Sequence, residues 1–158
     1  MDFVKLKFKV EGIKMKDTQK HTTNLLRGRL TVKSWIHDLK SLNSFIRLSG
    51  AYGFQGTRNK SVVEHLINKL DDIDPGVRVA AARGLGWMKD KKAVKPLIER
   101  LTDKVDEVRF ATIKALGEIG DERAAPPLAL LAEKMYPQDE TWKTVLDSLV
   151  MIYLETYG

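Results

Sequence analysis

A repeat of 31 residues constrains the fold of this chain more than any other feature of its sequence. When residues 62–92 are laid over residues 93–123, eleven of the thirty-one pairs are identical, whereas average residue usage would give roughly two. Four of the repeated positions are apolar at the spacing i, i+3, i+4, i+7, which is the stripe of an amphipathic helix. They are Val63, Leu66, Ile67 and Leu70 in the first copy, and Val94, Leu97, Ile98 and Leu101 in the second.

A second helix is predicted in each copy, after an acidic turn. Apolar and small residues continue there at helical spacing, and Gly86 and Gly117 lie near the expected helix ends, where glycine readily ends a helix. The matched positions are Val77, Ala80, Ala81, Leu85 and Met88, then Val108, Ala111, Thr112, Leu116 and Ile119. Each copy is therefore expected to form a short helical hairpin.

The same period extends in both directions. Shifting back by 31 residues aligns Arg47 with Arg78, and shifting forward places another first helix after Ala124 and a second helix if two residues are inserted. We therefore expect an all-α fold, an α-solenoid of about four helical hairpins over residues 31–158. The repeats are expected at about 31–61, 62–92, 93–123 and 124–156, with a basic N-terminal segment at 1–30.

The two central copies resemble a known repeat family. Val-Arg, then an Ala-rich stretch, Leu-Gly, Asp and a Pro before Leu are similar to the HEAT-like repeat of the short archaeal and bacterial type, also called the bilin-lyase-type HEAT repeat. The matching positions are Val77, Arg78, Leu85, Gly86 and Asp90, then Val108, Arg109, Leu116, Gly117, Asp121 and Pro127. The resemblance implies an α-solenoid whose second helices line a concave face, and it implies binding more often than catalysis. It does not imply bilin chemistry, because many unrelated proteins share the repeat.

Arginine recurs at one register of the repeat, at Arg47, Arg78 and Arg109, and aspartate recurs at another, at Asp90 and Asp121. We interpret these residues as a ladder of hydrogen bonds and ion pairs between repeats. A row of arginines that grips phosphates is the alternative.

The candidate binding residues are those that the repeat leaves free in its second helices. Aromatic and apolar residues interrupt the expected polar surface at these positions, with basic residues among them, which is typical of interface hot spots. The predicted partner-binding strip consists of Leu48, Tyr52, Val79, Arg83, Trp87, Phe110, Lys114 and Met151. Either a separate protein partner or residues 1–30 of the same chain would cover it.

The N-terminal segment carries most of the positive charge. Residues 1–60 hold thirteen Lys or Arg against four Asp or Glu, while the whole chain has a net charge of +6. Apolar residues alternate with lysines near the start, which predicts a short β-hairpin followed by a weak helix or coil. Nucleic-acid binding through this segment is therefore a second hypothesis, with contacts from Lys5, Lys7, Lys9, Lys14, Lys16, Arg27, Arg29 and Lys33.

Catalytic and metal chemistry find little support in the sequence. Cysteine is absent, and the three histidines, His21, His37 and His65, have no metal-ligand spacing. No Gly-rich phosphate loop or nucleophile elbow occurs. We therefore expect no enzymatic activity, no catalytic residues, no metal site and no cofactor.

Further expectations concern the C-terminal helix and the location of the protein. The segment from Leu149 to Leu154 is apolar around the whole helix, although a terminal repeat needs a polar outer face; a homodimer through this helix is the expected result. Without a secretory signal or an apolar run that could span a bilayer, a cytoplasmic location and no membrane contact are expected. Abundant Lys, Arg and Glu favours a thermophilic source.

These features favour a non-catalytic scaffold or adaptor that binds a protein partner on the concave face of the solenoid. Nucleic-acid binding by the basic segment is the first alternative, and membership of a larger assembly is the second. Salt dependence separates the first two, because about six phosphate contacts would lower the affinity on the order of a thousandfold between about 50 and 200 mM salt.

Overall fold

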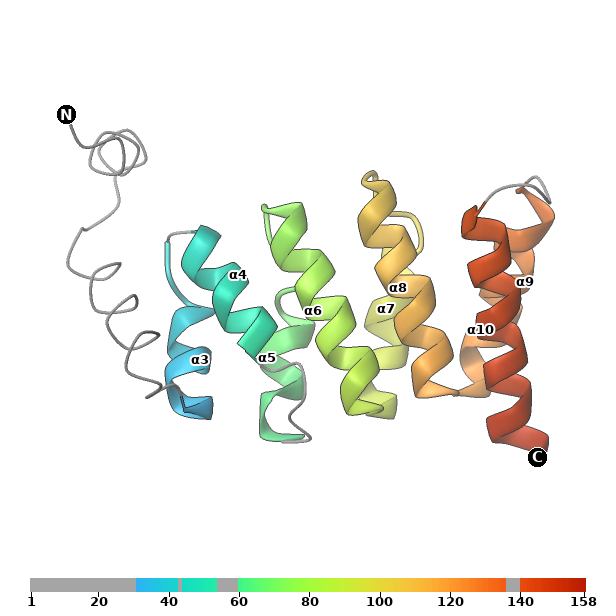
Figure 1. The fold of residues 1–158 in the computed structure, drawn as a ribbon, viewed down its shortest axis with the longest axis horizontal. Helices are drawn as coiled ribbons and strands as arrows, with labels where there is room; N and C mark the ends of the chain where they lie inside the picture. Colours follow the sequence, from blue (N-terminus) through green and yellow to red (C-terminus); the bar gives the residue numbers. More distant parts are fainter. Residues whose placement is uncertain (1–30, 43, 54–59, 136–139) are drawn as a thin grey trace.

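The computed structural model describes residues 31–42, 44–53, 60–135 and 140–158, and leaves out the side chains of Phe45, Tyr52 and Lys60. Within these residues the chain forms helical hairpins side by side in a row (Figure 1). The predicted all-α solenoid of four hairpins is thereby confirmed. The expected β-hairpin lies outside the described residues.

Each hairpin pairs a short first helix with a longer second helix. The first helices are α3 (Val32–Asp38), α5 (Val63–Ile67), α7 (Val94–Arg100) and α9 (Ala125–Glu133), and the last three follow the 3-10 turns η1 (Lys60–Val62), η2 (Lys91–Ala93) and η3 (Glu122–Ala124). The second helices are α4 (Ser44–Gly53), α6 (Pro75–Met88), α8 (Asp106–Ile119) and α10 (Glu140–Tyr157). Figure 1 shows α6, α8 and α10 as one layer in front of α5, α7 and α9. We call the surface of α4, α6, α8 and α10 the second-helix face.

Local sequence explains where the central helices begin and end. The Asp74 carboxylate accepts a 2.8 Å hydrogen bond from the Gly76 amide and Pro75 occupies the first turn, so α6 begins with a capped N-terminus. It ends at Lys89, whose φ of 49° is left-handed, and α8 ends in the same way at Gly120, with φ 70°. The two left-handed residues at the helix ends, Lys89 and Gly120, are 31 residues apart, so the repeat includes the turns as well as the helices.

The core is built from the repeated leucines. Leu66, Leu97 and Leu128 lie 31 residues apart in successive first helices, and each is 0% exposed. Burying one such side chain contributes about 1.5–3 kcal/mol relative to leaving it in water. Because α6 packs on α4 and α8, and α8 packs on α10, the hydrophobic core runs continuously along the solenoid.

No helix in the described part of the chain is long and apolar enough to cross a membrane. The cytoplasmic location expected from the sequence stays a prediction.

Candidate functional site

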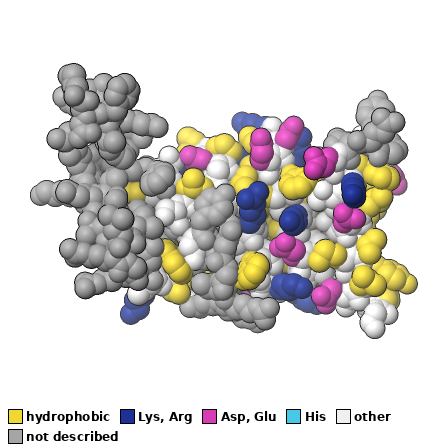
Figure 2. All heavy atoms as spheres, viewed as in Figure 1, with side chains coloured by type: hydrophobic (Ala, Val, Ile, Leu, Met, Phe, Trp, Pro, Cys, Tyr) yellow, Lys and Arg dark blue, Asp and Glu magenta, His cyan; other side chains and the backbone are white. Residues whose placement is uncertain are grey.

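A groove of about 380 Å³ opens on the second-helix face between α6 and α8. Its volume lies near the lower end of the range for small-ligand pockets. Figure 2 shows hydrophobic, basic and acidic side chains mixed over this part of the face. The groove is lined by Arg83, Trp87, Phe110, Ala111, Lys114, Ala115 and Glu118.

The helical repeat places these side chains in register. Arg83 and Trp87 are four residues apart on α6, and Phe110, Lys114 and Glu118 follow at four-residue steps on α8. Residues four apart lie on one side of a helix, so both rows point to the same groove. The 31-residue period matches Arg83 with Lys114 and Trp87 with Glu118.

Small residues let the two helices meet at the groove. A Cβ atom added to Gly86 would lie 2.8 Å from Ala115 Cα and 2.5 Å from Glu118 Oε2, so the backbones of α6 and α8 approach closely there. The longer side chains at the neighbouring positions then rise as the walls of the groove. The close helix contact therefore holds the walls at a defined separation.

The walls combine exposed aromatic surface with exposed positive charge. Trp87 is 54% exposed, Phe110 is partly buried, and Arg83 and Lys114 are exposed. Within the described residues, neither Arg83 nor Lys114 makes a side-chain hydrogen bond or ion pair. Aromatic residues beside arginine are the composition of interface hot spots.

Glu118 brings a carboxylate into the groove. Burial raises the pKa of Glu118, and the nearby Lys114 and Lys89 ammonium groups oppose this rise without cancelling it. Burial therefore disfavours the charged form of Glu118. The predicted strip did not include Glu118, although this residue lies at the same register as Trp87.

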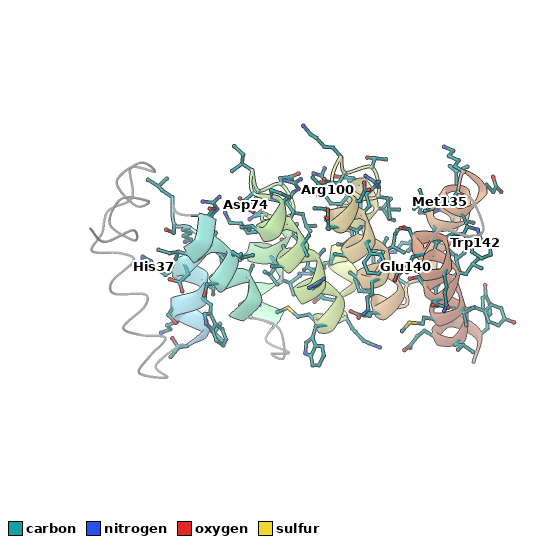
Figure 3. The ribbon with its side chains drawn as sticks, turned by 45° about the horizontal axis from the view of Figure 1, so that its top comes forward. His37, Asp74, Arg100, Met135, Glu140 and Trp142 are labelled. Carbon is teal, nitrogen blue, oxygen red and sulfur yellow. The ribbon has the colours of Figure 1, made fainter. Side chains whose placement is uncertain are left out.

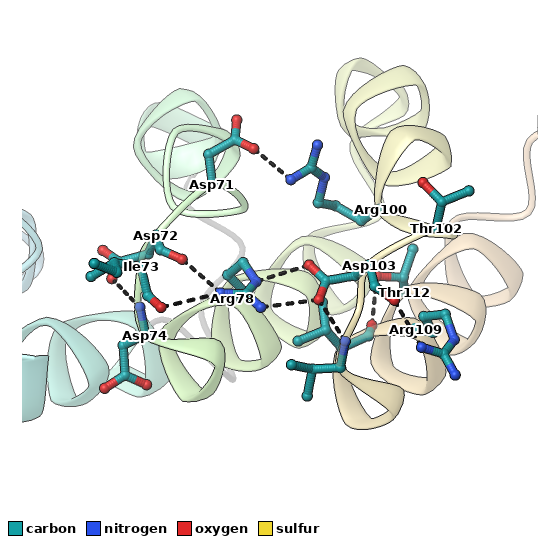
Figure 4. A network of polar contacts seen from close by, with 12 residues as sticks. Asp71, Asp72, Ile73, Asp74, Arg78, Arg100, Thr102, Asp103, Arg109 and Thr112 are labelled. Carbon is teal, nitrogen blue, oxygen red and sulfur yellow. Dashed lines mark hydrogen bonds and ion pairs between the residues drawn. The ribbon is translucent and has the colours of Figure 1, made fainter.

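The repeated arginines have a different role from the groove residues. Arg78 donates from Nε and Nη2 to the two carboxylate oxygens of Asp103, at 2.9 and 3.0 Å, and Arg47 makes the same two-bond contact with Asp72, at 2.8 Å for each bond. Figure 4 shows the Arg78 contact, which joins one repeat to the next. Both guanidinium groups are nearly buried, so they are not available to hold phosphates.

The two aspartates of the predicted ladder do not pair with the repeated arginines. The carboxylate of Asp90 accepts from the Lys92 amide, and that of Asp121 accepts from the Arg123 amide and side chain. Both residues therefore cap the 3-10 turns that precede first helices. Asp121 also lies 3.7 Å from Lys91 of the previous repeat.

The arginine ladder stops at Arg109. Asp72 and Asp103 are 31 residues apart, and the equivalent position one repeat later is residue 134. This residue is a lysine, so it cannot accept hydrogen bonds from an arginine as the aspartates do. Arg109 instead pairs with Asp106 of its own helix and donates to the Asp103 carbonyl oxygen at 2.8 Å. The contact of α8 with α10 depends on small groups: a Cβ on Gly117 would lie 2.8 Å from Ser148 Cα, and the Ser148 hydroxyl donates to the Ile113 carbonyl oxygen at 3.1 Å.

The structure brings only part of the predicted strip together. Arg83, Trp87, Phe110 and Lys114 line one groove, whereas Met151, 41% exposed, lies on α10 outside it. The expectation that Val79 is accessible is wrong: it is 8% exposed and belongs to the core, because α6 has a packed helix on either side. Leu48 is also packed against the core in part. The side chain of Tyr52 is not among those described.

The predicted nucleic-acid contacts are mostly outside the described structure. Lys33 is exposed on α3, and the other seven basic residues of that set lie in the segment before residue 31. The nucleic-acid hypothesis therefore stays a prediction. In the part of the chain that the structure describes, no three His, Asp or Glu side chains gather as a metal site requires.

A second exposed surface lies on the last hairpin. Figure 3 shows Met135 and Trp142 on this hairpin, at the opposite end of the described solenoid from His37. Large apolar side chains on α9 and α10 are between 53% and 72% exposed there. We call these residues the C-terminal face: Leu130, Val150, Tyr153, Leu154 and Tyr157.

Comparisons with known proteins agree with this geometry. Residues 63–140 match the family model of HEAT repeats. The fold is similar to a chain in the structure of the complex of CpcE and CpcF of phycocyanin lyase from Nostoc sp. PCC7120, with a TM-score of 0.72 and 27% sequence identity. The match covers 80% of this chain and 55% of that chain, so this chain spans about half the length of the structure that it matches. No protein of curated function matches the sequence.

Proposed function

Residues 63–140 are HEAT repeats, and from that premise we propose that this chain is a non-catalytic scaffold that binds a protein partner on its second-helix face. The observation that carries the proposal is the groove between α6 and α8, where Trp87 is 54% exposed between two helices that are otherwise well packed. Tryptophan and arginine are among the residue types that are enriched in the hot spots of protein interfaces. The similar solved structure is described as a complex of two proteins, which supports a protein partner for this fold.

The groove also supports binding over catalysis. Its described lining residues supply one carboxyl group and two basic groups. They include no histidine, serine or threonine that could act as a nucleophile or as a proton-transfer partner at neutral pH. Its remaining lining is apolar. A surface of this kind can select a partner by shape and charge.

The test is affinity capture with a matched pair of variants. Wild-type protein, Trp87→Ala and the control Ile73→Ala, which removes an apolar side chain that is 90% exposed outside the groove, are incubated with nuclease-treated host lysate. One protein should be recovered by wild type and by Ile73→Ala. Its purified form should bind Trp87→Ala at least tenfold more weakly, since a hot-spot residue contributes about 2 kcal/mol or more.

Two results would contradict the scaffold. Equal recovery of the partner by Trp87→Ala would place the binding surface outside the groove. In a parallel capture from lysate without nuclease, recovery of nucleic acid alone would favour the alternative in which the basic N-terminal segment binds nucleic acid. The affinity for that nucleic acid should then fall on the order of a thousandfold between about 50 and 200 mM salt.

The C-terminal face supports a second candidate, self-association into a dimer. Its five exposed side chains carry no formal charge, so two copies can bury apolar surface against each other about a two-fold axis. The groove is less suited to self-pairing, because it would place two sets of cations opposite each other. Light scattering should give twice the chain mass for wild type and the chain mass for Leu154→Glu. A wild-type monomer at high concentration would exclude this dimer.

A further inference from the structure

Building on the proposed function, we infer that the α6–α8 groove receives an extended segment of the partner with an apolar residue, an acidic residue and an apolar residue at alternate positions. The acidic side chain lies between Arg83 and Lys114, and the two apolar side chains contact Phe110 and Trp87. This inference assigns the chemistry of the ligand, which the proposed function leaves open.

The groove presents more positive than negative charge, because Arg83 and Lys114 lie there with the single carboxyl group of Glu118. The interior arginines of the solenoid already have partners: Arg47 and Arg78 each hold an aspartate through two hydrogen bonds. Arg83 and Lys114 share one register. Among the described residues Arg83 makes no side-chain hydrogen bond or ion pair, and Lys114 interacts with Glu118 through charge without a hydrogen bond. A carboxylate placed between the two would relieve their mutual repulsion and accept charge-assisted hydrogen bonds.

The order of residues along the groove sets the order of residues in the ligand. On α8 the sequence of lining residues is Phe110, then Lys114, then Glu118, and on α6 Trp87 follows Arg83. The cations therefore lie in the middle, with an aromatic ring toward each end. Glu118 lies beside the Trp87 end, so a second acidic residue in the ligand would be repelled there and an apolar residue is preferred.

The spacing along the helices matches an extended chain. Four residues of an α-helix rise about 6 Å, so the three levels of the groove are about 6 Å apart. Alternate residues of an extended segment are about 6.6–6.8 Å apart and point to the same side. Three alternate side chains can therefore meet the three levels in turn, and a groove of about 380 Å³ leaves room for few more.

The first experiment measures binding of short synthetic peptides to the full chain. The probe is acetyl-Leu-Ser-Glu-Ser-Leu-amide, whose blocked ends carry no charge, and the matched probes replace the central Glu by Gln or by Lys. A fourth probe moves Glu to the first position with the composition unchanged. Titrations follow the indole N–H signal of Trp87 by NMR, which is assigned with Trp87→Phe because the chain has three tryptophans. The original probe should bind at least tenfold more tightly than the Lys probe and more tightly than the rearranged one.

Charge-reversed variants test the role of the two cations. Arg83→Glu/Lys114→Glu should lose the Glu probe and prefer the Lys probe. The control Lys95→Glu/Lys104→Glu makes the same change in net charge at two exposed lysines outside the groove, and it should keep the wild-type order of affinities. If the doubly charge-reversed variant does not fold, the single variants Arg83→Gln and Lys114→Gln are used instead. Each should bind the Glu probe over the Lys probe with a smaller preference than the wild type.

The outcomes separate this inference from the proposed function. Equal binding of the Glu and Lys probes, or no shift of the Trp87 signal with any probe at millimolar concentration, overturns the inference. If the captured partner still depends on Trp87 in that case, the scaffold proposal stands and only the ligand chemistry is wrong. If neither probe nor partner depends on Trp87, both are wrong.

Discussion

Arg78 donates to both carboxylate oxygens of Asp103, twenty-five residues later in the chain, and thereby joins two successive repeats. Its Nη1 also donates to the Asp72 carbonyl oxygen at 2.8 Å, so one guanidinium binds the turns of two hairpins. The Arg78 and Asp103 side chains are 11% and 5% exposed. A solenoid has no contacts between distant repeats to hold it in shape, and this pair is one of the links that replace them.

Removal of one partner of this pair should destabilise the protein strongly. Arg78→Ala leaves the Asp103 carboxylate nearly buried without its cation, which costs about 3–5 kcal/mol in comparable buried pairs. The measurement is urea unfolding followed by circular dichroism. The control is Lys92→Ala, because Lys92 pairs with Glu64 and the two side chains are 72% and 67% exposed. Such pairs contribute about 0–1 kcal/mol. A similar decrease in the free energy of unfolding for both variants would show that the buried ion pair stabilises the protein no more than an exposed one.

The same aspartates should make the protein sensitive to acid. Burial by itself raises the pKa of Asp103, but hydrogen bonds from Arg78 and the Val105 amide outweigh it and hold the pKa below its ordinary value. The pKa of Asp72 is lowered in the same way by Arg47, the Asp74 amide and Lys69.

A lowered pKa in the folded state means that the unfolded state binds more protons, so this stability is present above the ordinary aspartate pKa of about 3.9 and is lost as the pH falls through the lower folded value. Unfolding free energies measured between about pH 6 and pH 2 should decrease with acid. In Asp103→Asn the decrease should be smaller, although the variant is less stable at neutral pH. An identical pH slope in both proteins would contradict the assignment.

Lys89→Gly should stabilise the protein. Lys89 has φ 49°, and a left-handed residue with a Cβ costs about 1–2 kcal/mol. Glycine removes this cost. Its greater conformational freedom in the unfolded chain offsets part of the stabilisation. The loss of the exposed ion pair between Lys89 and Glu155 changes the stability little. The melting temperature should therefore rise slightly. Lys95→Gly in α7 is the matched control, and it should lower stability by about 1 kcal/mol.

Gly86→Ala should destabilise the contact of α6 with α8. In a helix interior alanine is favoured over glycine by about 1 kcal/mol, but here its Cβ would lie 2.8 Å from Ala115 Cα on the adjacent backbone. Overpacking of this kind costs about 1–3 kcal/mol. Gly84→Ala is the control, because its Cβ meets only the end of Leu66 at 3.0 Å. Thermal unfolding should rank Gly84→Ala above Gly86→Ala, and the reverse order would show that the helices can move apart freely.

Part of the candidate site could be predicted from the repeat alone. Arg83, Trp87, Phe110 and Lys114 occupy positions that the periodic core does not use, and the structure places all four in one groove. Val79 has the same relation to the core pattern but is buried. The difference arises because a helical period assigns a face within one helix, whereas the neighbouring helix decides how much of that face stays open.

The sequence by itself determined the α-solenoid of helical hairpins and most of its core, because the spacing of Leu66 and its repeats within each helix is a local property. The tertiary structure decided which charges meet. The sequence predicted one ladder between repeats that includes the arginines, Asp90 and Asp121. In the structure Asp72 and Asp103 bind the arginines, and Asp121 pairs with Lys91. An ion pair depends on the distance between side chains of different repeats, and that distance is set by how closely the small residues let neighbouring helices pack.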